Sequence, residues 1–202
     1  MSVAVIVLAK APVAGLAKTR LAPALGAEGA AALAERLLVH AVGQAAAARL
    51  GPVEICTTPD TAHPVLQRLA AQHGATLSLQ GDGDLGQRMH RALARALLQH
   101  GRALLMGADA PALDAGLLRL AAQRLLSHDG VFVPARDGGY ALVGQRHADL
   151  RWFSGITWST PQVMQDTRRR LLQAGARWAE LPPVADIDGP DDLVHLPAGW
   201  LP

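Results

Sequence analysis

The stretch VAVIVLAKAPVAGLAKTRLAP, residues 3–23, opens the chain with an apolar run followed by a basic loop. The first seven of these residues are apolar and lack the basic region that precedes a signal peptide, so they predict a buried first strand. The loop that follows contains Lys10 and Lys18, the only two lysines in a chain that otherwise uses arginine. The stretch therefore indicates a strand whose carboxyl end leads into a specialised loop.

Apolar runs of strand length alternate with longer helical patterns along the chain, which is typical of βα units packed as a mostly parallel sheet. We predict strands at residues 3–9, 53–58, 76–80, 103–107, 130–134, 140–144 and 178–181. We predict helices at residues 28–49, 62–73, 85–100, 114–126 and 161–174, the last capped by Ser159 and Thr160, and a final helical turn opened by Pro190. The alternation predicts a single-domain, doubly wound α/β fold.

Composition narrows the class of protein. A chain of 202 residues that is 50% hydrophobic can bury the core of one domain. Its formal charge of +2 is spread along the chain, so we expect no nucleic-acid partner. No segment is long enough to span a membrane, and a single cysteine, Cys56, suits a reducing compartment. We expect a cytoplasmic protein, and the sequence leaves its oligomeric state, including a homodimer, open.

Unusual loops follow the predicted strands. In a doubly wound sheet the ligand crevice lies outside the carboxyl ends of the strands, so these loops should hold the chemistry. The loops are KAPVAGLAKTR, QGDGDLGQR, GADAP, PARDGG and DIDGP. Their common position at one edge of the sheet predicts a single site.

The opening loop ends in AKT, which is similar to the end of a P-loop, but that motif needs glycine where this loop has Pro12 and Ala17. Three cations in such a loop are suited to surround a diphosphate or triphosphate. The alternative is a solvated loop bounded by its prolines. We predict a phosphate-binding role for the glycine, the cations and the hydroxyl of the loop, namely Lys10, Gly15, Lys18, Thr19 and Arg20.

The GxGxxG pattern from Gly81 to Gly86 lies between a strand and a helix, as a dinucleotide-binding motif would. It occurs in the third βα unit, however, and two aspartates within it would repel a pyrophosphate. We interpret the segment as a turn in which Asp84 caps the next helix. Three residues at the start of that helix are predicted to line the crevice and contact the nucleotide, namely Gly86, Gln87 and Arg88.

Carboxylates mark two of the loops. Asp109 ends a buried strand, where a charge is costly unless it is paired, caps a turn or binds a metal. Asp186 and Asp188 are two residues apart, so both point to one side of an extended segment, which suits a divalent cation. Asp191 and Asp192 fall in a first helical turn and are assigned to structure. We predict Asp109, Asp188 and Asp186 as ligands of Mg²⁺ or Mn²⁺, completed by substrate phosphates.

Two further segments have two interpretations each. The turn RDGGY, residues 136–140, either serves backbone conformation alone or binds an acceptor, with Asp137 as a base or hydrogen-bond acceptor. Trp152, Phe153 and Trp158 either line the pocket or pack in the core. The histidines show no ligand spacing and none is close in sequence to Cys56, so zinc and thiol chemistry gain little support.

The segments AKAPVAGLAKTRLAP, DLGQRM, GADAP, PARDGGYALVG, FSGITWSTPQV and DIDGPDDL together resemble a small bacterial family of GT-A-like glycosyltransferases, sometimes linked to arsenosugar biosynthesis. The opening loop is also similar to that of 2-phospho-lactate guanylyltransferase, and DIDGPDDL to the closing motif of molybdenum-cofactor nucleotidyltransferases. This resemblance implies a nucleotide-diphospho-sugar transferase fold of the GT-A, Rossmann-like type over residues 1–202. It places Asp109 at the metal-binding aspartate and Asp188 near the second one, although GADAP has one carboxylate where many such enzymes have an Asp-x-Asp pair.

Three functions remain open at this point. The first is a Mg²⁺-dependent glycosyltransferase that uses a nucleotide sugar, with Lys18, Asp109 and Asp137 as catalytic residues. The second is a nucleotidyltransferase that moves a nucleoside monophosphate from a triphosphate to a phosphorylated small molecule. The third is a nucleotide-binding module without catalysis, which the single carboxylate of GADAP would permit. The family resemblance favours the first, and the basic opening loop favours the second.

Overall fold

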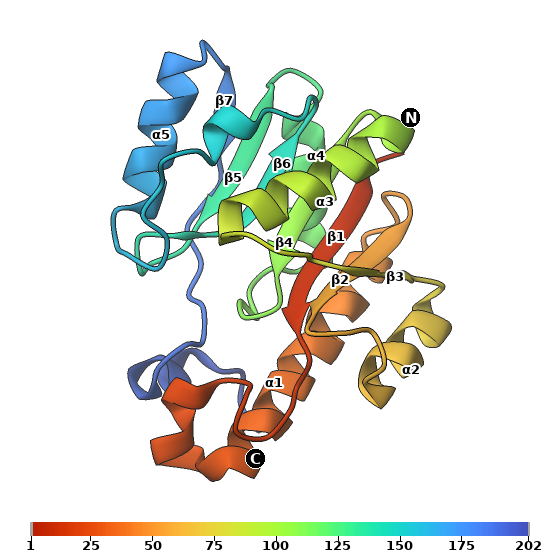
Figure 1. Cartoon of the computed structure of the whole chain (residues 1–202), viewed down its shortest axis with the longest axis vertical. Coiled ribbons are helices and arrows are strands. Elements are labelled where there is room, and N and C mark those ends of the chain that lie inside the picture. Colours follow the sequence, from red (N-terminus) through yellow and green to blue (C-terminus); the bar gives the residue numbers. More distant parts are fainter. Residues whose placement is uncertain (1, 202) are drawn as a thin grey trace.

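A seven-stranded sheet organises the computed structural model, which describes residues 2–201 (Figure 1). The strands lie in the order β3-β2-β1-β4-β6-β5-β7, and β6 runs antiparallel to both of its neighbours while the other pairs are parallel. Their bounds are β1 (Ala4–Lys10), β2 (Val53–Thr58), β3 (Thr76–Leu79), β4 (Ala103–Gly107), β5 (Gly130–Pro134), β6 (Tyr140–Gln145) and β7 (Trp178–Glu180). The mostly parallel α/β sheet predicted from the alternating pattern is confirmed.

Helices cover both faces of this sheet. They are α1 (Ala22–Ala47), α2 (Pro64–His73), α3 (Leu85–His100), α4 (Ala115–Arg124) and α5 (Val163–Gln173), with short 3₁₀ turns η1 (Thr19–Leu21), η2 (Leu150–Trp152) and η3 (Pro190–His195). One apolar cluster joins the sheet to α1, α2 and α4, and a second joins the opposite face to α3 and α5. Strands buried on both faces read as continuous apolar runs, which explains the sequence of β1.

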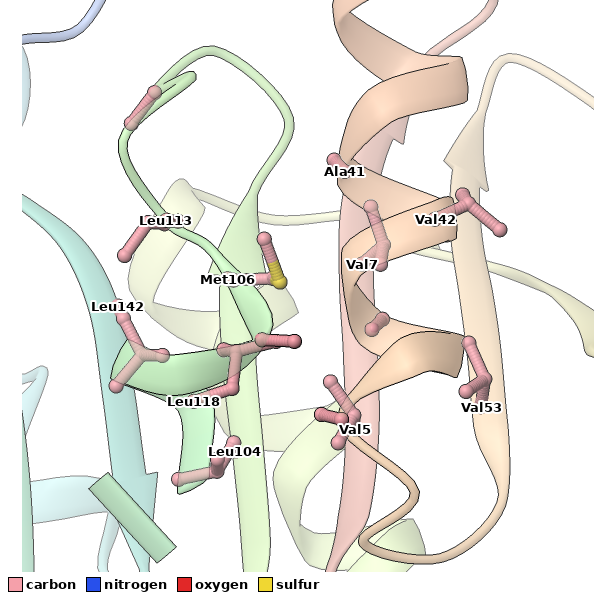
Figure 2. Packing of buried hydrophobic residues seen from close by; sticks show 14 of the residues in the cluster. Val5, Val7, Ala41, Val42, Val53, Leu104, Met106, Leu113, Leu118 and Leu142 are labelled. Carbon is pink, nitrogen blue, oxygen red and sulfur yellow. The ribbon is translucent and has the colours of Figure 1, made fainter. Parts of the chain in front are cut away.

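Figure 2 shows the first of these clusters at β1 and β4. Val5 and Val7 of β1 lie beside Ala41 and Val42 of α1, and Leu104 and Met106 of β4 lie beside Leu118 of α4. All of these side chains are almost completely buried. The central strands are thus fixed by packing, and the loops at their carboxyl ends start from a rigid base.

Local sequence signals set most helix ends. The Asp84 carboxylate accepts a hydrogen bond from the Gln87 backbone N–H at 2.8 Å, and the Gln87 side chain accepts one from the Asp84 N–H at 3.0 Å. This reciprocal cap confirms the interpretation of Asp84 and starts α3 at the predicted residue. Helix α1 begins six residues before the predicted position because Pro23 suits a first turn, and Gly26, with φ 72°, kinks it.

The predicted cap of α5 is wrong. The helix begins at Val163, and Thr160 donates instead to the Thr157 carbonyl at 2.8 Å. The tertiary structure overrides the capping pair because the Met164 N–H donates to the Gly138 carbonyl at 2.8 Å, which ties the helix start to the β5–β6 turn. The segment before α5 is therefore a series of turns that lies next to the β5–β6 turn.

A third apolar cluster lies beyond the carboxyl end of β1. It joins Leu21, Leu33 and Leu37 to Ile187, with Leu193 and Trp200 packed against it. Figure 1 shows the start of α1, in orange, and η3, in blue, together in this place. The opening and closing loops thus share a small core of their own. Across residues 2–201, none of the helices combines the length and apolar character needed to cross a membrane.

Candidate functional site

A cavity of about 740 Å³ lies at the carboxyl ends of the parallel strands. The opening loop, the end of β3, the residues after β4, the β5–β6 turn, the segment before α5 and residues 186–188 all contribute to its wall. Parallel strands end at the same edge of a sheet, which is why loops far apart in the sequence meet there. The predicted convergence of these loops on one site is observed.

Most of the predicted site residues line this cavity, namely Lys10, Lys18, Thr19, Arg20, Asp109, Asp137, Asp186 and Asp188. Four do not. Gly15 takes a left-handed conformation, with φ 75°, in the turn of the opening loop. Gln87 caps α3 and lines a second hollow of about 600 Å³, and Arg88 donates to the Gly83 carbonyl at 2.9 Å.

Gly86, the fourth of these, packs against the aromatic segment that precedes α5. A side-chain carbon at this position would lie 2.6 Å from Cζ2 of Trp158 and 2.9 Å from Cβ of Phe153. Trp152 and Phe153 are buried, as core packing requires, whereas Trp158 reaches the cavity. Gly86 therefore allows the segment that carries Trp158 to approach α3 closely.

Lys18 lies at the centre of the site. Its ammonium is 2.8 Å from Oδ1 of Asp109 and 2.8 Å from Oδ1 of Asp188, and it donates to the Ile187 carbonyl at 2.6 Å. Only 9% of the side chain is exposed. Burial would lower the pKa of Lys18, but the two carboxylates outweigh this effect and the pKa is raised. The ammonium therefore stays charged and bridges both carboxylates.

Backbone contacts hold these two carboxylates in place. The Ile187 N–H donates to the Asp109 carbonyl at 2.9 Å, which fastens the closing segment to the end of β4. The Asp192 carboxylate accepts hydrogen bonds from the N–H groups of Asp188, at 3.0 Å, and Gly189, at 2.7 Å. The structural role assigned to Asp192 is confirmed, and it orients Asp188 toward Lys18.

Asp137 and Asp186 form the acidic side of the cavity. Burial raises the pKa of Asp186 to about 6, with further contributions from the negative charges of Asp137 and Asp188. Asp137 Oδ1 accepts a hydrogen bond from the Gly139 N–H at 2.8 Å, and Gly138 has φ 96°. The segment forms a tight turn, and Asp137 also lines the cavity, so its geometry is compatible with both interpretations.

The carboxylates fit a divalent cation as a pair and not as a set of three. Within residues 2–201 no three His, Cys, Asp or Glu side chains are grouped closely enough to hold an ion by themselves. The predicted set of Asp109, Asp186 and Asp188 is therefore not grouped as three ligands in residues 2–201. In the described chain, Oδ2 of Asp109 and Oδ2 of Asp188 accept no hydrogen bond. Two carboxylates plus substrate phosphates are a usual shell for Mg²⁺.

Gln80, which follows β3, is a site residue that the sequence prediction missed. It is 6% exposed, and its amide nitrogen donates to the carbonyls of Ala9, at 2.8 Å, and Cys56, at 3.3 Å. Because both partners are acceptors, the amide nitrogen must face them, which leaves Oε1 toward the cavity that Gln80 lines. A polar amide at the end of an apolar strand was the only available signal.

The arrangement of the sheet and its helices matches the fold of nucleotide-diphospho-sugar transferases and nucleotidyltransferases. The model of the bacterial family "Uncharacterized protein conserved in bacteria (DUF2064)" matches residues 39–160, and the chain belongs to this family. No curated protein matches the chain.

Three solved structures are similar to this one. A candidate nucleotide-diphospho-sugar transferase from Desulfovibrio desulfuricans G20 is 30% identical, with a TM-score of 0.86 over 96% of this chain and 85% of that chain. A nucleotidyl transferase from Methanothermobacter thermautotrophicus is 15% identical, with a TM-score of 0.63 over 99% and 98% of the two chains. Glucosyl-3-phosphoglycerate synthase from Mycobacterium tuberculosis, in complex with Mn²⁺ and UDP, is 11% identical, with a TM-score of 0.57 over 96% and 75%. The last two share the fold alone.

The packing at Gly86 predicts that Gly86→Ala destabilises the protein. The added methyl group would overlap Trp158 and Phe153, and overpacking of this kind costs about 1–3 kcal/mol. Gly43→Ala in α1 is the matched control, since no atom lies within 4 Å of the added carbon and alanine favours a helix. Urea unfolding measures both. A Gly86→Ala protein with unchanged stability but impaired nucleotide binding would instead support the predicted nucleotide contact.

The raised pKa of Asp186 predicts a pH-dependent effect of Asp186→Asn. The folded protein holds this proton up to about pH 6, whereas the unfolded chain loses it near 3.8, so ionisation of Asp186 costs stability as the pH rises through this window. The variant should be more stable than the parent by about 1 kcal/mol at about pH 8, after solvent screening, and equal to it at about pH 4. Denaturant melts at both pH values measure the difference. An equal difference at the two values would contradict the assignment.

Proposed function

We propose that the protein is a divalent-cation-dependent transferase that uses a nucleotide-activated donor, and that this donor is a nucleotide sugar. One observation carries the proposal: three cations of the opening loop and four carboxylates line the same cavity at the carboxyl edge of the sheet. A nucleotide sugar needs cations for its phosphates and oxygen acceptors for its sugar and acceptor hydroxyls. The resemblance to nucleotide-diphospho-sugar transferases supports the same reading.

Lys10 and Arg20 are suited to bind the donor phosphates. Both are exposed at the cavity wall, and neither side chain forms an ion pair within residues 2–201. Ammonium and guanidinium groups bind phosphate oxygens through strong, charge-assisted hydrogen bonds. Asp109 and Asp188 would hold Mg²⁺ or Mn²⁺, which stabilises developing charge on a departing phosphate.

The acceptor would lie at the β5–β6 turn, between Asp137 and Trp158. Asp137 keeps its second oxygen free to accept a hydrogen bond from the acceptor hydroxyl and to take its proton. The hydroxyl oxygen bonds to the anomeric carbon, the bond from that carbon to the phosphate oxygen breaks, and a nucleoside diphosphate leaves. Lys10 and Arg20, at the cavity wall, would stabilise its negative charge.

Nucleotidyl transfer is the second candidate, because three cations in one loop suit a triphosphate. In that reaction an oxygen of a phosphorylated acceptor attacks the α-phosphate, and pyrophosphate leaves. A nucleotide-binding module without catalysis is the third. Such a module would bind nucleotides but form no product with any acceptor, and Asp109→Asn would change only its affinity.

We also propose that residues 1–202 form a single functional domain in the cytoplasm. The residues that line the cavity run from Leu8 to Asp188 in sequence, so the site draws on most of the chain. The only cysteine, Cys56, is buried and unpaired in β2, which suits a reducing compartment.

A panel of nucleotides tests the proposal through thermal stability. A ligand at about a hundredfold above its dissociation constant should stabilise the fold by about 2.7 kcal/mol. We expect nucleotide sugars with Mn²⁺ to raise the melting temperature more than nucleoside triphosphates do. Lys10→Gln should weaken this binding about tenfold, since a charge-assisted hydrogen bond contributes about 1.5 kcal/mol or more.

The control for Lys10→Gln is Arg146→Gln. Arg146 follows β6, whose antiparallel direction places its carboxyl end at the edge of the sheet opposite the cavity. This variant removes the same charge and should bind nucleotides as the parent does. If no nucleotide shifts the melting temperature of the parent, the transferase proposal fails.

Gln80 should contribute to binding of the base and not of the phosphates. Gln80→Met removes the Oε1 acceptor together with the amide donor to Ala9 and Cys56. Loss of the acceptor should lower nucleotide affinity about tenfold, which corresponds to one hydrogen bond of about 1.4 kcal/mol. Isothermal titration with UDP and GDP measures the loss. Affinity for inorganic pyrophosphate, which lacks a base, should stay unchanged. An equal loss for pyrophosphate would show that Gln80 acts only through the fold.

A further inference from the structure

The Lys18 ammonium occupies the position that joins the two carboxylates of the proposed cation site. It contacts Oδ1 of both Asp109 and Asp188, and the Ile187 carbonyl fixes it from a third direction. Lys18 itself has φ 48° and ψ 42°, a left-handed backbone that non-glycine residues rarely adopt. A lysine does not favour this left-handed backbone conformation by itself. The contacts of its side chain with Asp109, Asp188 and Ile187 must therefore stabilise it.

A divalent ion and this ammonium compete for the same two carboxylates. An ion bound to Asp109 and Asp188 would lie within a few ångströms of a positive charge that is only 9% exposed, where water screens the repulsion poorly. The protein also supplies no third carboxylate, cysteine or histidine to complete the shell within residues 2–201. The carboxylates alone, with Lys18 in place, therefore form a poor cation site.

Phosphates would remove both obstacles to cation binding, namely the incomplete coordination shell and the repulsion from Lys18. Their oxygens complete the coordination shell of the cation, and their negative charge offers Lys18 another partner. Lys10 and Arg20 line the same cavity, so a diphosphate bound there would also lie within the positive field beside Lys18.

We propose that Lys18 is a resident counter-ion that bridges Asp109 and Asp188 until a metal–nucleotide complex displaces it, so that cation binding depends on the nucleotide. This role rests on the proposed function for its ligand, but its main test needs no nucleotide. Lys18 is thus a positioning residue in the free protein, and it becomes a phosphate contact in the complex.

Lys18→Met tests the proposal, because loss of a site residue usually weakens ligand binding and here it should strengthen Mn²⁺ binding. It keeps the length of the side chain and removes the charge, so the affinity of the nucleotide-free protein for Mn²⁺ should increase by about 5- to 150-fold, the usual range for coupled sites. Electron paramagnetic resonance of free Mn²⁺ measures this directly. Lys18→Gln is a second variant, since it lacks the charge but retains a donor for the Ile187 carbonyl.

Lys10→Met is the matched control. It removes the same charge from the same cavity, but Lys10 is exposed and contacts neither Asp109 nor Asp188. Its effect on Mn²⁺ affinity should stay within about threefold, because solvent screens an exposed charge. A similar increase of Mn²⁺ affinity in Lys10→Met and Lys18→Met would show that only the overall charge of the cavity matters, and it would overturn the bridging role.

The same Mn²⁺ titrations in the presence of UDP or GDP form the second part of the experiment. In the parent protein, whichever of them binds should increase Mn²⁺ affinity strongly, and in Lys18→Met this increase should be smaller. Unchanged or weaker Mn²⁺ binding in both folded Lys18 variants would overturn the proposal even if nucleotides bind. Tighter Mn²⁺ binding in the variants without binding of any nucleotide would keep the counter-ion role and reject the transferase function.

Discussion

The bridge from Lys18 to Asp109 and Asp188 is the interaction on which the site depends. It joins three separate parts of the chain: the opening loop, the end of β4 and the closing segment, with Lys18 and Asp188 separated by 170 residues. The apolar cluster around Leu21 and Ile187 packs the same two loops together. Without the ammonium, two carboxylates would face each other at the cavity wall and repel each other until another cation took its place.

The sequence predicts the fold well because burial leaves a simple pattern. Strands β2, β4 and β5 and helix α3 have the predicted bounds, since each is an apolar run or helical pattern bounded by turn or capping residues. The rule that parallel strands end at one edge then predicts which loops meet. It correctly brings Lys10, Lys18, Arg20 and the aspartates to one cavity.

The same rule does not say which way each loop residue faces. Gly86, Gln87 and Arg88 follow a strand, yet local capping and the packing of Trp158 take them away from the cavity. Gln80 is the opposite case, since its contacts with Ala9 and Cys56, on neighbouring strands, hold its side chain at the cavity wall. Orientation depends on residues far away in the sequence, which no local pattern contains.

Charge balance supports the proposal that the nucleotide and the cation bind together. The cavity holds the cations Lys10, Lys18 and Arg20 against four carboxylates, and burial together with neighbouring negative charge already raises the pKa of Asp186 to about 6. A nucleoside diphosphate alone would add to this negative charge, and a divalent ion alone would repel Lys18. When both bind, the ion offsets the phosphates, and Lys18 exchanges carboxylate partners for phosphate partners of the same sign. The proposed coupled binding of nucleotide and cation would therefore keep the charge of the site nearly constant, whereas either ligand alone would not.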